Sequence, residues 1–231
     1  MVKRYRVTEL LSCDYIDYFP GAEEHMERGR RIHEKIQGEL LQMLNPEFVE
    51  VEKEISYRFE AGGVEYEIVG HVDVLETNPV ANNYRIFEIK PYRPKLPEVW
   101  VHQVLFYETI LRETTGVNYW SYFVLYDKSG EIRDIRPLRT GSVDHDKLIK
   151  QLVLLRRKYG RIKVASTLCN YCTLKNVCDK PVKLPPVMYK YRTLIIEKYK
   201  GVPGMRRATP HTVERAEGAK HKNRAGLEKY M

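Results

Sequence analysis

Three strand-like segments in a row, joined by two short turn signals, constrain the fold of this chain most. The segments comprise residues 49–59, 64–75 and 84–89. The turn signals between them are Gly62-Gly63 and Asn82-Asn83. Glycine and asparagine favour tight turns because they tolerate positive φ. A meander in which each strand lies beside the next is therefore expected in this part of the chain.

Helical patterns stand on both sides of the meander. Residues 22–44 have the apolar spacing of an amphipathic helix and end before Pro46. Further helices are expected at about 98–112 and 144–159, with a strong strand at 118–127 and a weaker one near 131–136. This order predicts an α/β or α+β fold with a mixed central sheet and helices packed on its faces.

The formal charge of +8 is concentrated at the C-terminus. Residues 181–231 contain twelve Lys or Arg and four Glu, which accounts for the whole excess and leaves residues 1–180 neutral. We expect one body at 1–180 and a basic extension at 181–231. The extension, including Arg206 and Arg207, is predicted to bind a polyanion such as DNA. A solvated, flexible tail that keeps the protein soluble is the alternative.

The chain has no membrane signal. No apolar run approaches the ~20 residues that a membrane helix requires, and residues 1–11 lack the core of a signal peptide. The sequence therefore predicts a cytoplasmic protein without a membrane contact.

An acid and a base share one face of the third strand-like segment. Glu88 and Lys90 stand two residues apart, so both side chains point to the same side of an extended chain, while Phe87 and Ile89 can fill a core on the other. Asp73 lies in the preceding segment. The asparagine turn folds the two segments together, and this should bring Asp73 near Glu88.

Two carboxylates on adjacent strands repel each other unless a positive group lies between them. Mg²⁺ or Mn²⁺ suits this role, because these ions take carboxylate and phosphate oxygens as ligands. Lys90 would then face the attacking water and the scissile phosphate, where it orients or deprotonates the water and stabilises negative charge. A solvent-facing ladder of ion pairs is the alternative interpretation of Asp73, Glu88 and Lys90.

Two helices carry further candidates. His33, four residues after Gly29, can supply a nitrogen ligand, although a lone histidine on a charged helix is more often solvated. A glycine inside a helix costs ~1 kcal/mol and indicates the close approach of another backbone or of DNA. Gln103 and Tyr107 lie one turn apart, where an amide and a phenol can hold a DNA strand. Helix packing explains Tyr107 nearly as well.

Three of the four cysteines stand close together. Cys169, Cys172 and Cys178 form a C-x2-C-x5-C array, and Cys13 lies alone near the N-terminus. Three thiolates this close in a cytoplasmic protein indicate a metal whose fourth ligand comes from a distance. Chemistry alone leaves Zn²⁺ and a [4Fe-4S] cluster open. Disulfide bonds are a further alternative.

These motifs, taken in chain order, resemble those of RecB-type nucleases in the PD-(D/E)xK superfamily. They are Gly29-x-x-x-His33, Gly70-x-x-Asp73, Glu88-x-Lys90 and Gln103-x-x-x-Tyr107. With the cysteines added, residues 5 to about 180 resemble the CRISPR-associated exonuclease family Cas-four. The resemblance implies a restriction-endonuclease-like fold in which a cysteine-ligated cluster joins the N-terminal segment to the C-terminal region.

The resemblance also implies roles for the motif residues. His33, Asp73 and Glu88 would bind Mn²⁺ or Mg²⁺, with the backbone carbonyl of Ile89 as a further ligand, and Lys90 would act as the catalytic lysine beside Asp73 and Glu88. Two supporting DNA-binding residues are implied, Gln103 and Tyr107. The implied ligands of the [4Fe-4S] cluster, which we interpret as a structural staple, are Cys13, Cys169, Cys172 and Cys178.

A metal-dependent DNA nuclease is the function that the sequence predicts. From the resemblance we expect action on single strands or DNA ends, 5′-to-3′ polarity and a part in trimming CRISPR spacers with an integrase. The basic extension departs from the family and leaves a viral or mobile-element role open. Two rival hypotheses are a catalytically inactive DNA-binding module and a zinc-stapled adaptor, and a homo-oligomer stays open.

Overall fold

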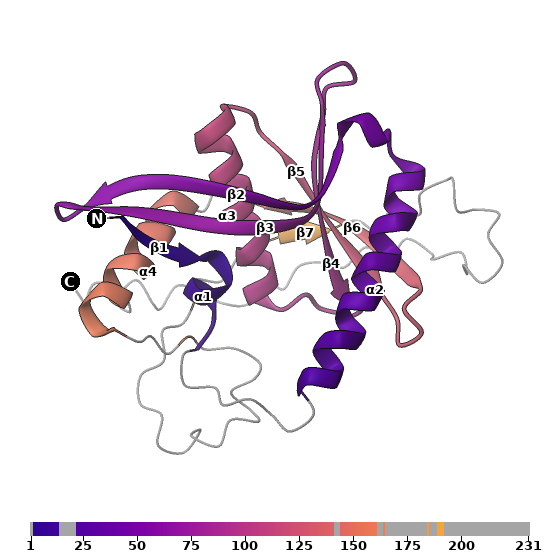
Figure 1. Ribbon diagram of the computed structural model, residues 1–231, viewed down its shortest axis with the longest axis horizontal. Coiled ribbons are helices and arrows are strands. Elements are labelled where there is room, and N and C mark those ends of the chain that lie inside the picture. The colour runs from indigo at the N-terminus through magenta and orange to yellow at the C-terminus, as the bar shows by residue number, and fades with distance from the viewer. Residues whose placement is uncertain are drawn as a thin grey trace.

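The computed structural model describes residues 2–13, 22–140, 144–160, 164, 184 and 189–191. Its helices and strands follow one another in the order shown in Figure 1. The strands are β1 (Lys3–Arg6), β2 (Val49–Ala61), β3 (Val64–Asn78), β4 (Asn83–Pro91), β5 (Trp120–Tyr126), β6 (Ile132–Thr140) and β7 (Tyr189–Tyr191). The helices are α1 (Val7–Leu11), α2 (Ala22–Met43), the 3₁₀ turn η1 (Pro46–Phe48), α3 (Glu98–Thr115) and α4 (His145–Tyr159).

Within these residues the strands form one mixed sheet in the order β1-β3-β4-β5-β6-β7, with β2 paired to β3. The hairpin of β2 and β3, the hairpin of β3 and β4, and the pair of β5 and β6 are antiparallel. The pairs β1 with β3 and β4 with β5 are parallel. The predicted fold class, a mixed sheet flanked by helices, is confirmed.

Strand β3 organises the sheet because it has two different partners on one edge. β2 pairs along almost its whole length, from Val64 to Glu76. On the opposite edge β1 pairs as far as Val69, and β4 begins at Val74. The four residues between them, 70–73, are paired with neither strand. This gap between two strands placed end to end provides the position of the site described below.

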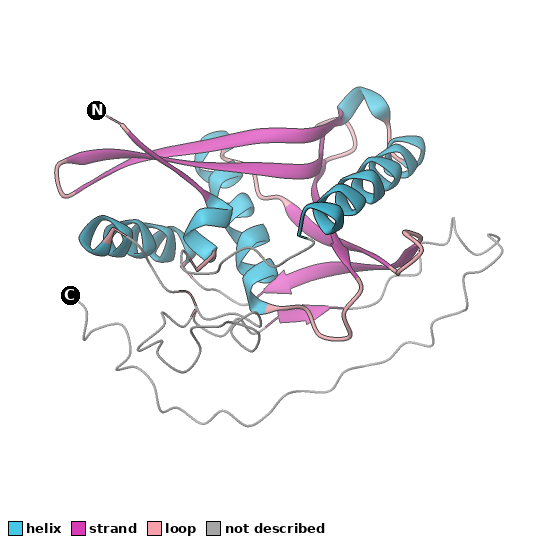
Figure 2. Ribbon diagram, turned by 60° about the horizontal axis from the view of Figure 1, so that its bottom comes forward, coloured by secondary structure: helices cyan, strands magenta, loops and turns pink. Residues whose placement is uncertain are grey.

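Helices cover both faces of the sheet (Figure 2). Ile36 and Leu40 of α2 pack on one face, against Phe87 and Ile89 of β4. The other face packs against α1, α3 and α4. Because side chains alternate along a strand, β4 directs Ile86, Glu88 and Lys90 toward that second face. The sequence-based assignment of opposite faces to Phe87 and Glu88 is therefore correct.

The predicted elements agree with the structure to within a few residues, but four short ones were not predicted. These are β1, α1, η1 and β7, each of three to five residues, too short for a periodic pattern to be recognised. β7 lies within the predicted extension and pairs with β6, so these residues belong to the sheet. None of the described helices combines the length and the apolar character needed to cross a bilayer.

Candidate metal and phosphate site

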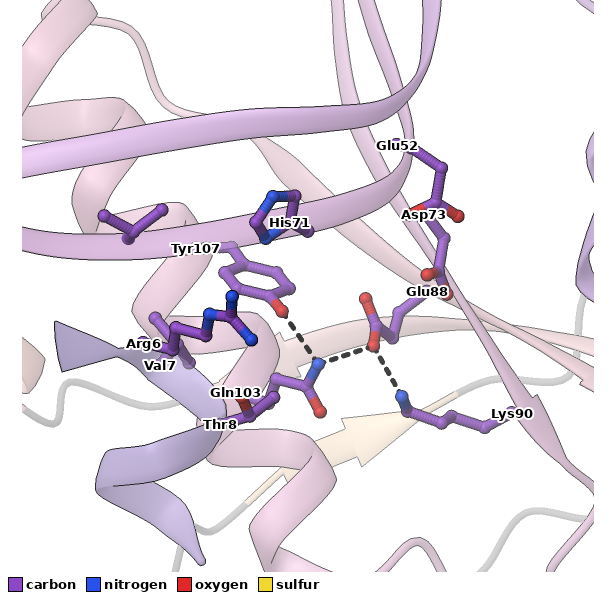
Figure 3. Close-up of a pocket in the computed structure, with 12 residues that line it drawn as sticks. Arg6, Val7, Thr8, Glu52, His71, Asp73, Glu88, Lys90, Gln103 and Tyr107 are labelled. Carbon is purple, nitrogen blue, oxygen red and sulfur yellow. Dashed lines mark hydrogen bonds and ion pairs between the residues drawn. The ribbon is translucent and has the colours of Figure 1, made fainter. Parts of the chain in front are cut away.

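A pocket of about 140 Å³ opens at the gap on the edge of β3. Its walls come from the end of β1, the start of α1, strands β2, β3 and β4, and helix α3 (Figure 3). Asp73, Glu88, Lys90, Gln103 and Tyr107, which the sequence singled out, all line it. The fold thus brings these five side chains to one place.

Asp73 is held at the junction of β3 and β4. The ladder between the two strands starts at Val74 and Phe87, so the next pair along it would be Asp73 and Glu88. The Asp73 carboxylate accepts a hydrogen bond of 2.7 Å from the backbone N–H of Ile89. The Asp73 side chain therefore takes the place of a backbone carbonyl as acceptor of this hydrogen bond, and the residue is 9% exposed.

Glu88 is a buried carboxylate with one satisfied oxygen and one unsatisfied oxygen. Its Oε1 lies 2.7 Å from the Lys90 ammonium and accepts a hydrogen bond of 2.8 Å from the Gln103 amide. Its Oε2 is buried and has no hydrogen-bond partner. Burial, and then the negative charge of Asp73, raises the pKa of Glu88 to about 7, although Lys90 acts in the opposite direction.

Lys90 keeps its positive charge in this pocket. Burial by itself lowers the pKa of Lys90, but the negative charges of Glu88 and Asp73 outweigh it, and the pKa is raised. An ammonium group fixed 2.7 Å from a carboxylate at a pocket wall is suited to stabilise the charge of a bound phosphate.

Tyr107 of helix α3 packs against the unpaired part of β3 at Gly70, and Gln103 lies beside it, one turn earlier in the helix. The Gln103 amide that binds Glu88 also donates to the Tyr107 hydroxyl at 2.8 Å, and that hydroxyl accepts from the backbone of His71. Gly70 makes room for this contact, since a Cβ atom there would lie 2.5 Å from the Tyr107 ring. Tyr107 is 1% exposed, so in the structure it orients Gln103 from behind the pocket.

His33 of α2 approaches Asp73 from the face of the sheet that α2 covers. Its Nδ1 lies 3.6 Å from an oxygen of Asp73, and its ring meets the ring of Tyr126 edge-on. A Cβ atom at Gly29, one turn earlier, would meet nothing within 4 Å. Packing within the described residues therefore does not require this glycine.

Glu52 of β2 is a candidate that the sequence analysis missed. Ligand atoms of His33, Glu52 and Asp73 all lie within 4.8 Å of one another. The β2–β3 ladder skips the pair Glu52 and Asp73, and Glu52 has a φ of 49°. A signal existed in the sequence, because counting back through a hairpin closed at Gly62-Gly63 places Glu52 opposite Asp73.

Two basic side chains at the pocket were also not predicted. Arg6 is the last residue of β1 and His71 follows Gly70, and both are exposed residues of the pocket wall. Figure 3 shows the guanidinium of Arg6 pointing toward Gln103 and Tyr107. Arg6 adds positive charge on the side of the pocket away from Glu52.

The donors present fit a hard divalent cation. They are carboxylate oxygens and one imidazole, a set that suits Mg²⁺ or Mn²⁺ and contains no sulfur. The unpartnered Oε2 of Glu88 also indicates a missing positive partner, because an unpaired buried carboxylate oxygen costs free energy. The residues therefore fit the predicted metal.

Of the residues predicted to bind the cluster or DNA through the basic extension, only Cys13 lies within the described residues. Cys13 follows α1, is partly exposed and is free among the described residues. Its predicted cluster partners, and the two arginines expected to bind DNA, fall in ranges that the structure does not describe; they are Cys169, Cys172, Cys178, Arg206 and Arg207.

Comparisons with known proteins identify a family. The sequence model of the PD-(D/E)XK nuclease superfamily matches residues 5–179. No curated protein sequence matches the chain. Among solved structures, SSO0001 is similar with a TM-score of 0.48 and 17% identity over 78% of this chain and 87% of that one. A "putative exonuclease" of Eubacterium rectale has a TM-score of 0.33 and 13% identity over 74% and 67%.

Proposed function

The chain belongs to the PD-(D/E)XK nuclease superfamily, and from this premise we propose that it hydrolyses the phosphodiester bonds of DNA in a reaction that depends on Mn²⁺ or Mg²⁺. The observation that supports this most is the pocket at the edge of β3, where Asp73, Glu88 and Lys90 meet. An inactive descendant of the family would not be expected to keep a buried carboxylate paired with a partly buried ammonium, because this pair is costly to maintain.

The residues divide the chemistry between them. A bound divalent ion supplies Lewis acidity toward the phosphate and lowers the pKa of water. Asp73, Glu88 and His33 would hold it, with the backbone carbonyl of Ile89 as a further ligand. Lys90 stabilises charge on the phosphate and orients the attacking water. Gln103 holds the Glu88 carboxylate in position beside Lys90, because its amide binds the same carboxylate oxygen as the ammonium.

Single-stranded DNA or a DNA end is the substrate we propose. A pocket of about 140 Å³ is small beside the 300–1,000 Å³ of ordinary ligand sites, so it admits a phosphate with part of one nucleotide. The preference for a single strand over a duplex rests on the resemblance to the CRISPR-associated family. Arg6 and His71 would bind the phosphates beside the scissile one. The resemblance to the CRISPR-associated family extends the proposal to 5′-to-3′ exonuclease action.

Degradation of labelled single-stranded DNA tests this proposal. The wild type should degrade it with Mn²⁺ and not with EDTA, and Lys90→Ala should lose roughly 10²-fold or more in rate. Lys95→Ala is the matched control, because this lysine is exposed beyond the end of β4. Comparing linear with circular strands separates exonuclease from endonuclease action. Equal rates for the wild type and Lys90→Ala would refute the enzyme and favour a DNA-binding module.

A [4Fe-4S] cluster held by the four cysteines is a separate part of the proposal. It rests on the spacing of the cysteines and on the position of Cys13 directly after α1, which packs in the core beside α3 and α4. Anaerobic purification with an absorption spectrum and an iron assay tests it. A colourless protein loaded with zinc would replace the cluster by Zn²⁺ and leave the nuclease unaffected.

The biological setting and the basic extension complete the proposal. Trimming of spacers beside a CRISPR integrase is the role that the resemblance supports, and processing of viral or mobile-element DNA is the alternative; gene neighbourhood decides between them. Removing residues 192–231 spares β7 and should weaken DNA binding and flatten its salt dependence. An unchanged salt slope would exclude this segment, with Arg206 and Arg207, from the interface.

A further inference from the structure

Strand β5 ends in a tyrosine that lies beside the site but outside the pocket. Tyr126 is paired with Pro91, the residue after Lys90, in the ladder of β4 and β5. Its ring packs edge-on against His33, with the ring centroids 6.2 Å apart. The pairing of β5 with β6 shifts register between Leu125 and Tyr126. An irregularity of this kind bends a strand and redirects its side chains, often next to an active site.

The hydroxyl of Tyr126 is available to a ligand. The residue is half-buried, its ring packs on the core under α2, and none of the described groups exchanges a hydrogen bond with its hydroxyl. Burial raises the pKa of this phenol, whereas the positive charges of Lys90 and Arg28 lower it. The charge of Asp73 also raises it, from the side where the proposed metal ion would bind. Two cations therefore lie near a hydroxyl that can donate a hydrogen bond to an anion.

Arg28 of α2 brings an exposed guanidinium to the same place. It donates a hydrogen bond to the backbone carbonyl of Lys128, in the turn between β5 and β6, and it forms no ion pair with a carboxylate of the described residues. The turn is well fixed, because the side chain of Asp127 accepts hydrogen bonds from two of its backbone N–H groups. Arg28 and Tyr126 are thus held at one turn, and the charge of Arg28 stays available to an anion.

Helix α2 leaves room for a ligand next to Arg28. Gly29 and His33 lie one turn apart on the same side of this helix. Among the described residues, nothing lies within 4 Å of a Cβ atom placed at Gly29. An extended molecule can therefore approach the backbone of α2 closely between the guanidinium and the imidazole.

Positive groups thus lie on two sides of the buried carboxylate. In Figure 3 Arg6 lies on one side of Glu88 and Lys90 on the other. Tyr126 and Arg28 extend the second side toward α2. We propose that Tyr126 and Arg28 bind one phosphate of the DNA strand, next to the scissile phosphate on the α2 side, so that the strand runs from Arg6 across the site to α2. This inference rests on the proposed nuclease function and adds to it the path of the strand.

Binding of an uncleaved strand tests the proposal apart from catalysis. The full chain is titrated into a fluorescein-labelled oligothymidylate with Ca²⁺ in place of Mn²⁺, and a gel shows that the strand stays intact. Tyr126→Phe removes only the hydroxyl, and Arg28→Gln removes only the charge. Each should weaken binding about 10-fold, as the loss of one hydrogen bond to a charged group does. The double variant should lose less than the product of the two losses, because both groups bind one phosphate.

Two matched controls separate this contact from general effects. Tyr122 lies on the same face of β5, stacked on Phe87, and is also half-buried. Arg31 lies on the same helix as Arg28 and is paired with Glu27. Tyr122→Phe and Arg31→Gln should bind DNA as the wild type does. All four single variants should unfold at the wild-type temperature, because none of the removed groups supports the core.

The dependence of affinity on salt distinguishes the two groups. Each phosphate that a cation neutralises on a single strand adds about 0.7 to the slope of log affinity against log salt. Arg28→Gln should therefore lower this slope by about 0.7, and Tyr126→Phe should leave it unchanged. Wild-type affinity for Tyr126→Phe, or an unchanged slope for Arg28→Gln, would overturn the proposal and leave the nuclease standing. These differences in a protein that leaves DNA intact in Mn²⁺ would support the phosphate position and refute the nuclease.

Discussion

The two ends of the pocket both present a glutamate to Asp73, in opposite surroundings. Glu88 is almost completely buried, lies against an ammonium and an amide, and is fixed by helix α3. Glu52 is exposed, has positive φ and is held by one neutral amide from α2. The charge of Glu88 is therefore balanced by Lys90, whereas none of the described lysines or arginines pairs with Glu52.

This difference indicates different tasks. A buried ion pair keeps its geometry because moving either partner would leave a charge unpaired in a poorly solvated place. It suits groups that must meet a phosphate in one orientation. An exposed carboxylate on a strained backbone gains a partner when a cation arrives from solvent. We therefore interpret the Glu88 end as the preorganised end and the Glu52 end as the exchangeable one.

Replacing the residue that the two ends share should have the largest effect. Asp73→Asn removes the charge between Glu52 and Glu88, while its amide can keep the contact with the Ile89 N–H through the side-chain oxygen. We expect Mn²⁺-dependent cleavage to fall by roughly 10³-fold or more and Mn²⁺ binding to be weakened strongly. Cleavage rates and Mn²⁺ titration measure this. Mn²⁺ binding at wild-type affinity would show that Asp73 is not a metal ligand.

A methyl group at Gly70 should disturb the preorganised end alone. In Gly70→Ala the new Cβ would lie 2.5 Å from the Tyr107 ring, which must move and take Gln103 with it. We expect a loss of about 1–3 kcal/mol in unfolding free energy and a lower cleavage rate. Urea denaturation measures the first and the DNA assay the second.

The matched control for this change is Gly38→Ala in α2. Nothing lies within 4 Å of a Cβ atom at Gly38, and alanine favours the helix, so stability should rise by up to about 1 kcal/mol. If Gly70→Ala were as stable and as active as Gly38→Ala, the contact between Tyr107 and the edge of β3 would have no role.

Removing one hydroxyl should have a smaller effect. Tyr107→Phe keeps the ring but leaves the Gln103 amide and the backbone of His71 without their shared oxygen. We expect about 1 kcal/mol of destabilisation and a decrease in kcat of about 10-fold, with the count of bound Mn²⁺ unchanged. An altered ion count would mean that α3 also supports the exchangeable end.

Glu108 provides a half-buried carboxyl outside the site, and its hydrogen-bond partner is the hydroxyl of Ser121 and not a lysine. Burial raises its pKa to about 7, although Ser121 donates to it and Arg112 is near. Because the folded-state pKa exceeds the unfolded value near 4.5, its stabilising contribution is complete below about pH 4.5 and is lost as pH rises through 7. This is the smallest effect we predict.

Glu108→Gln should therefore be about as stable as the wild type at pH 5 and more stable, by about 1 kcal/mol or more, at pH 8. Urea denaturation in EDTA at both pH values measures this. Glu113→Gln on the same helix is the control, since its carboxylate is paired with Arg112 at the surface. If the unfolding free energy of Glu108→Gln differed from that of the wild type by the same amount at both pH values, burial would not raise the pKa of this carboxyl.

Much of the fold and half of the site could be predicted from local patterns. The turn at Gly62-Gly63 lies at the centre of the hairpin of β2 and β3, and the alternation in β4 separated Phe87 from Glu88. The second turn was placed too late, because the loop between β3 and β4 comprises residues 79–82 and Asn83 already pairs with Asn78. The same counting would have found Glu52 had it been applied to the first hairpin. Gln103 and Tyr107 were recognised as one helix face, but their contact with Glu88 and Gly70 could not be, because it depends on how α3 packs on the sheet.

The sequence by itself determined the strand register and the face of each side chain, because both follow from backbone periodicities that act over a few residues. Only the tertiary structure decided that β1 and β4 lie end to end along β3 and leave residues 70–73 open as a pocket. It also decided that α2 and α3 approach this opening from opposite sides, with His33 and Gln37 from one and Gln103 from the other. These choices depend on contacts between segments far apart in the chain, which no local pattern encodes.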